Sequence, residues 1–301
     1  MKRIAIALVV IAVVLAGLWS YLTAREDFPE TSTYRIDLDA LKALAESEGG
    51  TLPTAVHHEL VALVGLPKGM VFAGEPMDEH PMVHGAYLVE YAEGGGVMID
   101  AAFGEADMAG FLFEGRFDAR AFEKVRSTML EVDHIVLTHE HFDHIGGLAY
   151  APDAQAVSER LVMNPEQLAS SEAEQYLPDE LRSKLEPVDY EETMLLAPGV
   201  VLLRAPGHTP GSQIVYVLLA SGEEMLFIGD VAWALDQIRN EHYRPRLVTD
   251  IFLGEDREGV MHQMLALKGV MAGGRATVVS SHDVEDRRRL IEAGVIGEGF
   301  P

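Results

Sequence analysis

The feature that most constrains this chain is a short segment carrying three histidines and an aspartate. The segment, Thr138-His139-Glu140-His141-Phe142-Asp143-His144, directly follows a strand-like apolar run. His139 and His141 are two positions apart, so they point to the same side of an extended chain. Asp143 and His144 then turn toward a second point. This density of ligating side chains predicts metal coordination at the end of a strand.

Three further candidate ligands occur in the same sequence context. His208, Asp230 and His282 each follow an apolar, strand-like run. In the same order, these runs are Val200–Leu203, Met225–Ile228 and Thr277–Val279. Strand ends that meet at one edge of a sheet let a rigid scaffold hold functional side chains on loops. We therefore expect these side chains to converge with those of the histidine-rich segment.

Together the candidates exceed what one ion can bind. Five imidazoles and two carboxylates are more than a tetrahedral zinc uses, and a catalytic ion also keeps a position open for water. We expect two divalent ions, with Asp230 as the bridge between them. Zinc is the expected metal, and manganese, cobalt or iron are alternatives. The chain has no cysteine, which excludes thiolate ligands and disulfides.

The N-terminus carries a second strong signal. An apolar run from Ile4 to Leu22 follows Lys2 and Arg3 and is long enough to span a bilayer. It is interpreted as an uncleaved anchor, or alternatively as a signal peptide cleaved near Ala24. In both cases the basic start stays cytoplasmic and the remainder is exported. We expect residues 1–24 to be this segment, and residues 25–301 to lie in the periplasm or on the extracytoplasmic face.

Charge and composition limit the classes of partner that this chain is expected to bind. The formal net charge of -25 opposes binding to a phosphate backbone, so nucleic acid is not an expected partner. A hydrophobic content of 48% at 301 residues is sufficient for a folded core. The expected partner is a small molecule, and the oligomeric state stays open.

Hydrophobic patterning predicts a sheet-containing domain covered by helices. Asp37 is expected to cap a short helix that ends near Ser47, and the stretch from Gly49 to Pro81 is expected to form loops and short pieces. His57 and His58 in that stretch are assigned surface or packing roles. The remaining expected strands are Ala86–Tyr91 and Val97–Ile99, which form a hairpin, Val132–Leu137 and Ile214–Leu219. Helices are expected over Asp118–Leu130, Pro165–Tyr176 and Glu258–Lys268.

The motifs resemble those of the metallo-β-lactamase fold superfamily. The pattern His-x-His-x-Asp-His stands at His139 to His144, Gly-His-Thr-Pro-Gly at Gly207 to Gly211, and Gly-Asp at Gly229-Asp230. His282 matches the final histidine, and Val97 to Asp100 resembles the family's early strand ending in Asp. The resemblance covers roughly residues 82 to 285.

This resemblance implies an α/β fold, an αββα sandwich of two mixed sheets between helices, for the domain after the N-terminal transmembrane segment. One ion would be held by His139, His141 and His208. The other would be held by Asp143, His144 and His282. Asp230 would bridge the two ions. True β-lactamases have no bridging aspartate at this place, so the resemblance points away from β-lactam hydrolysis.

The ligand spacing and Phe142 are most similar to the acyl-homoserine lactonases, but Trp233 stands where those enzymes have a tyrosine. The expected reaction is hydrolysis of a lactone or related ester by a hydroxide shared between two ions. Asp143 and Asp230 are the candidates to orient that water and move its proton. Alternatives are hydrolysis of a thioester, phosphodiester or sulfate ester, or a metal-binding module without turnover.

Other residues near the motifs have open roles. Trp233 is expected to line the pocket or to pack in the core. His84 and His134 are candidates for contacts behind the metal ligands, although core or surface positions are favoured. Glu140 should point away from the metals, because it alternates with two ligands. The residues expected either in a lid that holds an anionic group or in a solvated basic loop are Arg239, Tyr243, Arg244 and Arg246.

Overall fold

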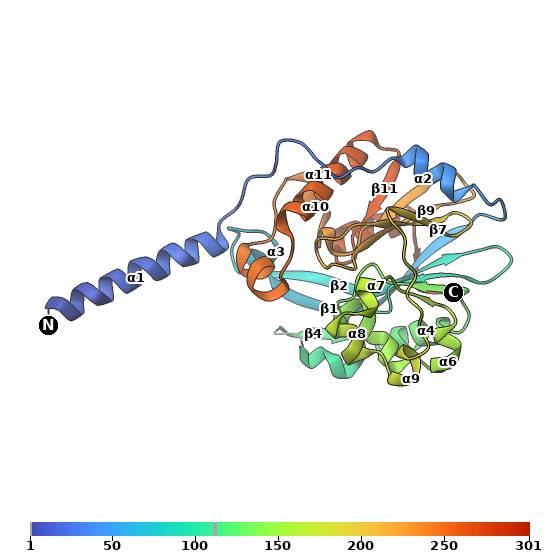
Figure 1. The fold of residues 1–301 in the computed structure, drawn as a ribbon, viewed down its shortest axis with the longest axis horizontal. Helices are drawn as coiled ribbons and strands as arrows, with labels where there is room; N and C mark the ends of the chain where they lie inside the picture. Colours follow the sequence, from blue (N-terminus) through green and yellow to red (C-terminus); the bar gives the residue numbers. More distant parts are fainter. Residues whose placement is uncertain (1, 111–112) are drawn as a thin grey trace.

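A computed structural model of the chain describes residues 2–110 and 113–301 (Figure 1). Two sheets pack face to face, and helices cover the outer face of each sheet. This αββα arrangement confirms the expected fold class. Both sheets are mixed, because each contains parallel and antiparallel strand pairs.

The first sheet carries His84 on β2 and the His139 segment after β5, with β3 between these two strands. Its main path has the order β12-β1-β2-β3-β5-β6, and β4 pairs with β1 beside that path. In chain order the strands are β1 (Ala55–Pro67), β2 (Glu79–Glu90), β3 (Gly96–Ile99), β4 (Gly115–Phe117), β5 (His134–Val136), β6 (Leu161–Val162) and β12 (Gly297–Glu298). β3, β5 and β6 are mutually parallel, so their carboxyl ends share one edge.

The second sheet has the order β11-β10-β9-β8-β7. Its strands are β7 (Thr193–Ala197), β8 (Val200–Arg204), β9 (Gln213–Leu218), β10 (Glu224–Phe227) and β11 (Ala276–Val279). β9 is buried along its whole length and shows how both faces are used. Val215 and Val217 pack between the sheets, whereas Ile214 and Tyr216 pack under the covering helices. This alternation follows from the two-residue period of a strand.

Helices on the two outer faces complete the layers (Figure 1). The first sheet is covered by α4 (Ala119–Thr128), α6 (Ala154–Ser158), α8 (Ser171–Tyr176) and α9 (Asp179–Arg182). The second sheet is covered by α2 (Leu38–Ala45), α10 (Leu235–Arg239) and α11 (Arg257–Gly273). The other helical elements are α3 (Lys68–Val71), η1 (Glu105–Gly110), α5 (Phe142–Ile145), η2 (Gly146–Tyr150), α7 (Pro165–Leu168), η3 (Gly229–Val231), η4 (Leu247–Leu253, a π-helix) and α12 (Val284–Glu292).

Several expected elements are confirmed. Asp37 caps α2 and Asp118 caps α4, since each carboxylate accepts hydrogen bonds from backbone N–H groups of the first turn. β2 and β3 form the expected hairpin around Gly94 and Gly95, both of which have positive φ. The expected helix over Pro165–Tyr176 divides into α7 and α8, because the Ser170 side chain caps a new helix by accepting from the Ala173 N–H.

The expectation of loops between Gly49 and Pro81 is wrong. β1 occupies 13 residues of this stretch and pairs with β2 along most of its length. Its sequence lacks a clean alternation of apolar and polar residues, so the partner strand, rather than the local pattern, stabilises it. His57 and His58 lie in β1, and His58 is buried beside Tyr87, so the packing role expected for it is confirmed. The edge strand β7 was also not anticipated.

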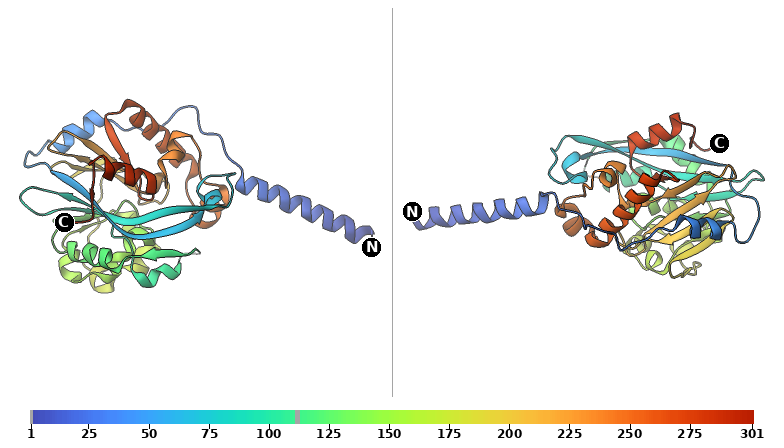
Figure 2. Two further views of the ribbon diagram at one scale, coloured as in Figure 1. Left: turned by 180° about the vertical axis from the view of Figure 1, so that it is seen from behind. Right: turned by 90° about the horizontal axis from the view of Figure 1, so that it is seen from above.

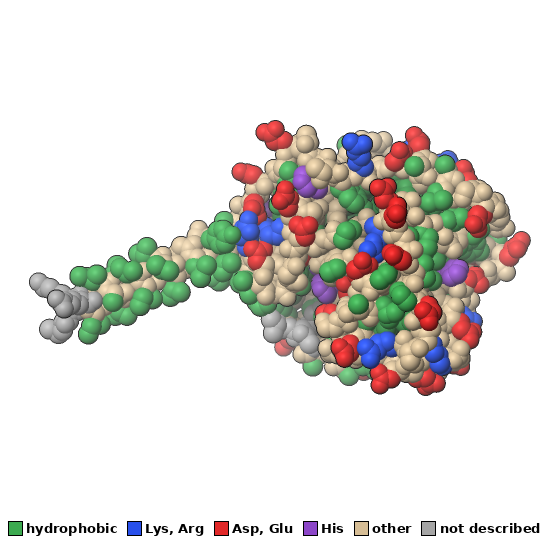
Figure 3. Space-filling view, viewed as in Figure 1, with side chains coloured by type: hydrophobic (Ala, Val, Ile, Leu, Met, Phe, Trp, Pro, Cys, Tyr) green, Lys and Arg blue, Asp and Glu red, His purple; other side chains and the backbone are tan. Residues whose placement is uncertain are grey.

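One helix in the described part of the chain stands apart from the domain. α1 (Lys2–Thr23) extends away from it in all views (Figures 1 and 2). Its segment Ile4–Thr23 has a mean hydropathy of 2.5 and none of it is buried, so by length and composition it is able to cross a membrane. Apolar side chains surround α1, whereas acidic side chains are scattered over the domain surface (Figure 3).

Gly147 allows the turn after the histidine-rich segment to approach the chain that follows β3. A Cβ atom at this position would lie 1.9 Å from the Ala101 carbonyl oxygen. We expect Gly147→Ala to destabilise the folded domain by about 1–3 kcal/mol, because backbone must shift to make room. Thermal unfolding of the full chain in detergent would show this as a lower Tm.

Gly269→Ala is the matched control. Gly269 lies within α11, and a Cβ atom there would have no neighbour within 4 Å. Alanine should leave the domain equally stable or more stable, by up to about 1 kcal/mol, because it favours the helix. Equal Tm values for both variants would contradict the close approach at Gly147.

Candidate metal centre

Strand ends from both sheets bring the candidate ligands together. The segment containing His139 follows β5 of the first sheet, whereas His208, Asp230 and His282 follow β8, β10 and β11 of the second. β10 and β11 are parallel, and β8 has the same direction because both β8 and β10 are antiparallel to β9. Their carboxyl ends therefore lie at one edge, as the sequence predicted.

The first group of ligand atoms comes from His139, His141, His208 and Asp230. One atom from each residue lies within 4.8 Å of the other three. His208 Nε2 is 2.9 Å from His141 Nδ1 and 3.4 Å from Asp230 Oδ2. The three imidazoles are those predicted to share one ion.

The second group surrounds the other oxygen of Asp230. His282 Nε2 is 2.9 Å and His144 Nε2 is 3.4 Å from Asp230 Oδ1. Asp143 Oδ2 is 3.5 Å from His282 Nε2 and 3.7 Å from His144 Nε2. Thus each oxygen of the Asp230 carboxylate faces a different group of imidazoles.

These separations suit ions held between the side chains. Two ligand atoms each about 2.1 Å from a tetrahedral zinc lie ~3.4 Å apart, which is similar to the separations found in both groups. His139 Nε2 and Asp230 Oδ1 are buried and have no hydrogen-bond partner among the residues described. Buried polar atoms normally have partners, so the geometry fits divalent cations.

The opposite sides of the imidazole rings are fastened to the surrounding protein. His144 Nδ1 lies 2.8 Å from Asp100 Oδ2, and His208 Nδ1 lies 2.6 Å from Glu255 Oε1. His282 Nδ1 lies 2.7 Å from the Val83 carbonyl oxygen. Each Nδ1–H can donate to these acceptors, which leaves Nε2 directed inward as a ligand.

Asp100 is held in an uncommon backbone conformation. Its φ of 61° lies in the left-handed region, directly after β3. The carboxylate accepts hydrogen bonds from the Thr138 N–H at 2.7 Å and from the Thr138 hydroxyl at 2.9 Å. These bonds fix its position against His144. The sequence signal for Asp100 was its place at the end of the early strand.

Burial and neighbouring charges act on the pKa values of the site residues in opposite directions. Burial lowers the pKa of His141 to about 3, and neighbouring His208 acts in the same direction. Burial also opposes the charged form of His144, but the Asp100 and Asp143 carboxylates outweigh it and raise this pKa well above its usual value. For Asp230, nearby imidazoles outweigh burial and hold the carboxyl pKa well below its usual range. A buried anion among imidazoles attracts cations.

His84 lies directly beside the candidate ligands, although the sequence favoured a core or surface position away from them. It is buried on β2, and its Nδ1 lies 3.1 Å from Asp143 Oδ2. His84, Asp143 and His282 form a third cluster of ligand-type atoms. The sequence favoured a core or surface position because nothing local to His84 resembles a motif. His134, at the start of β5, is absent from these clusters.

Two other expectations about neighbouring residues are resolved. Trp233 contacts the site, since its indole N–H donates to Asp230 Oδ2 over 2.6 Å. Glu140 points away from the metal ligands, as expected, and its carboxylate accepts from the Thr209 hydroxyl over 2.7 Å. It also accepts from the Gly211 N–H, so Glu140 joins the histidine-rich segment to the loop that carries His208.

Tyr243 and Arg244 occupy neither a lid nor a solvated basic loop. Both are buried, and Arg244 pairs with Glu255 over 2.8 Å. The Tyr243 hydroxyl also donates to Glu255, which in turn contacts His208. The two residues thus support a candidate ligand. Glu255 itself was missed, because its role depends on contacts with distant parts of the chain.

Arg239 and Arg246 bind acidic side chains of this same chain. Arg239 pairs with Asp236 and Asp286. Arg246 pairs with Glu26 and Asp250. Their charges are therefore partly balanced within the protein.

The sequence profile of the metallo-beta-lactamase superfamily matches residues 81–282. An N-acyl homoserine lactonase from Bacillus sp. is 30% identical over 159 residues, which cover 52% of this chain and 57% of that enzyme. The corresponding lactonase of Bacillus cereus is 26% identical over 220 residues, covering 67% of this chain and 82% of the relative. Ribonuclease TTHA0252 from Thermus thermophilus is 24% identical over 204 residues, covering 60% and 47%.

Solved structures agree on the fold. The structure of a quorum-quenching N-acyl homoserine lactone hydrolase superposes with a TM-score of 0.63 at 19% identity, covering 79% of this chain and 96% of that one. A structure of such a hydrolase with N-hexanoyl-L-homoserine at its metal centre gives a TM-score of 0.62 at 18% identity, with coverage of 79% and 97%. At these identities the likeness supports the fold alone.

Asp100→Asn tests the fastening of His144. Asparagine keeps the shape of the side chain, but one of the two carboxylate oxygens is replaced by an N–H₂ group. This group cannot accept hydrogen bonds from Thr138 or His144. We expect metal affinity to fall about 10–100-fold. Titration against a chelator would measure the change. Asp179→Asn, at a side chain that is 95% exposed, should leave affinity unchanged, and an equal effect of both substitutions would contradict the assignment.

Proposed function

This chain is a hydrolase of the metallo-β-lactamase superfamily, and from that premise we propose that it opens lactones or cleaves related carboxylic esters at a two-metal site. The observation that carries the proposal is the position of Asp230, whose two oxygens face separate groups of imidazoles. Similarity to N-acyl homoserine lactonases supports the substrate class.

The residues divide into two ligand sets. His139, His141 and His208 would hold one ion, and Asp143, His144 and His282 would hold the other. Asp230 would contact both. Two divalent ions, which we propose to be zinc, supply a water of lowered pKa and a Lewis acid for the substrate carbonyl.

Asp143 and Asp230 are the proposed proton carriers. The Asp143 side chain is 12% exposed, against 4% for Asp230, so Asp143 is the more accessible to substrate. It would orient the attacking water and pass a proton to the leaving oxygen. Asp230, held by neighbouring imidazoles, would chiefly fix the separation of the ions.

Trp233 distinguishes this site from the lactonases that it resembles. The indole N–H donates to Asp230, but an indole does not exchange its proton near neutral pH as an acid would. Trp233 would therefore orient the carboxylate without acting in proton transfer. This leaves proton transfer to the carboxylates.

A phosphodiester is the second candidate substrate, because a ribonuclease is among the relatives. The net charge of -25 disfavours a polyanionic substrate. Initial rates on lactones, thioesters, phosphodiesters and sulfate esters would decide the class, with zinc, manganese, cobalt or iron restored to metal-free protein. The lactone should be cleaved fastest. Turnover of phosphodiesters alone would overturn the proposal, and no turnover of any substrate would favour a binding module.

Asp230→Ala tests the proposed bridge. The wild-type chain should carry close to two metal ions, whereas the variant should lose at least one and its kcat/KM should fall by several orders of magnitude. Asp230→Asn should recover little, because it keeps the shape but lacks the charge. Elemental analysis and kcat/KM on the best ester measure both effects.

Glu172→Ala, at a half-buried residue of α8 that is not a candidate metal ligand, is the control and should retain full activity. A melting curve for each variant separates loss of metal from loss of fold. If Asp230→Ala kept both ions and most of its activity, the bridging role would be wrong.

We further propose that α1 anchors the domain to the outer face of the cytoplasmic membrane, with Lys2 and Arg3 inside. Protease added to intact spheroplasts should then digest residues 25–301. Survival of the domain there, with digestion only after lysis, would reverse this topology. Release of the domain into the periplasmic fraction would instead indicate a cleaved signal.

A further inference from the structure

We propose that the exposed side of η4 rests in the surface of the same bilayer that α1 crosses. The docking surface consists of Ile251 and Phe252. This inference rests on the membrane location proposed above for α1 and is independent of the reaction. Its occupant is lipid, at the boundary between headgroups and acyl chains.

Ile251 and Phe252 are unusual for their exposure. Outside α1, the large hydrophobic side chains exposed in residues 24–110 and 113–301 are Met77, Leu130, Ile251 and Phe252. Ile251 is 61% exposed and Phe252 is 59% exposed, and they are consecutive. Contiguous exposed apolar surface marks contact sites for proteins or membranes.

The end of α1 is tied to the beginning of η4. The guanidinium of Arg246, the residue before η4, lies 5.0 Å from the ring centre of Tyr21 in the last turns of α1. Arg246 also pairs with Glu26, just beyond α1. Arg257 pairs with the same carboxylate over 2.7 Å. If α1 spans the bilayer, η4 must therefore lie at the surface of that bilayer.

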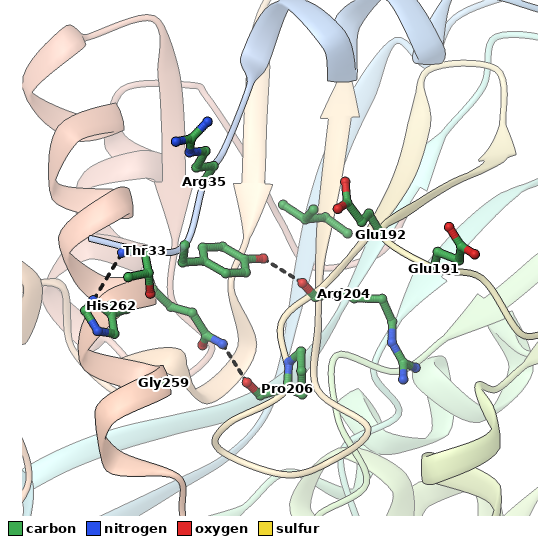
Figure 4. Close-up of a pocket in the computed structure, with 11 residues that line it drawn as sticks. Thr33, Arg35, Glu191, Glu192, Arg204, Pro206, Gly259 and His262 are labelled. Atoms are coloured by element: carbon green, nitrogen blue, oxygen red, sulfur yellow. Dashed lines mark hydrogen bonds between the residues drawn. The ribbon is translucent and has the colours of Figure 1, made fainter. Parts of the chain in front are cut away.

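The segment after α1 is fastened to the domain and so holds this geometry. The Arg25 guanidinium donates to the Asn240 carbonyl over 2.9 Å. Farther along, the Thr33 N–H donates to His262, and the Tyr34 hydroxyl donates to the Arg204 carbonyl (Figure 4). Thr33, Tyr34 and Arg35 help to line a cavity of about 660 Å³, whose lining contains none of the seven candidate metal ligands. The segment is thus docked on the protein rather than free.

Local charge also suits a membrane surface. Although the protein is acidic overall, Arg246 and Arg257 both pair with Glu26 and with Asp250, a residue of η4. These arginines offset the nearby carboxylates. Tyr21 contributes an aromatic ring of the kind enriched at membrane–water interfaces. These ion pairs therefore reduce the repulsion between anionic headgroups and the Glu26 and Asp250 carboxylates.

η4 also connects this surface to the metal centre. Its inner residue Val248 packs in one cluster with Trp233, which donates to Asp230. Val248 and Trp233 thus link η4 to a candidate metal ligand. Contact with the bilayer would hold this wall of the site in a fixed position.

Because the chain has no cysteine, single thiols can be placed at will. We would label Phe252→Cys with an NBD fluorophore in the full chain, reconstituted in phosphatidylcholine and phosphatidylglycerol vesicles. Lipid carrying a nitroxide near the headgroup serves as the quencher. Ser221→Cys is the control, because Ser221 is exposed in the turn between β9 and β10. The Ala220 N–H of this turn donates to the Pro53 carbonyl oxygen in the loop after α2. This loop lies at the opposite end of the domain from α1 (Figure 1). Leu8→Cys reports on α1 itself.

We expect quenching at Phe252 to exceed that at Ser221 several-fold and to accompany a blue-shifted emission. Quenching at Leu8 but not at Phe252 would overturn the docking surface while leaving the membrane anchor intact. A blue-shifted Phe252 label that lipid does not quench would assign the surface to a protein partner and also overturn it. Absence of quenching at Leu8 would refute both the anchor and this inference, without bearing on catalysis.

Discussion

The burial of the Asp230 carboxylate between two groups of imidazoles is the constraint on which the rest of the structure depends. Removing a carboxylate from water costs several kcal/mol unless opposite charge compensates. Asp100, Asp143 and Asp230 are all at or near the site, and in the described structure their ion pairs involve histidines rather than lysine or arginine. Divalent cations would provide the missing charge and would then form one electrostatic unit with the site.

Two sheets make this unit possible because each supplies ligands from strand ends at a shared edge. The second sheet aligns β8, β10 and β11, while β5 delivers the histidine-rich segment from the first. Contacts behind the ligands then fix their orientation. Glu255 holds His208 and is itself held by Arg244, and Asp100 holds His144. These contacts hold the candidate ligands in position.

The N-terminal segment adds a second organising element. Glu26 joins the end of α1 to the region around η4 through Arg246 and Arg257. The orientation of the domain relative to α1 is therefore determined by ion pairs rather than by a loose linker. Since η4 also packs near Trp233, attachment and site geometry share one structural element.

The sequence by itself determined the convergence of ligands, because His139 to His144 combine dense ligating groups with a preceding strand. It also determined local features such as the Asp37 and Asp118 helix caps, whose hydrogen bonds span only a few residues. Only the tertiary structure decided β1 and the positions of His84 and Glu255. The pairing partner of a strand and the acceptor behind a ligand both come from distant parts of the chain, so no local pattern encodes them.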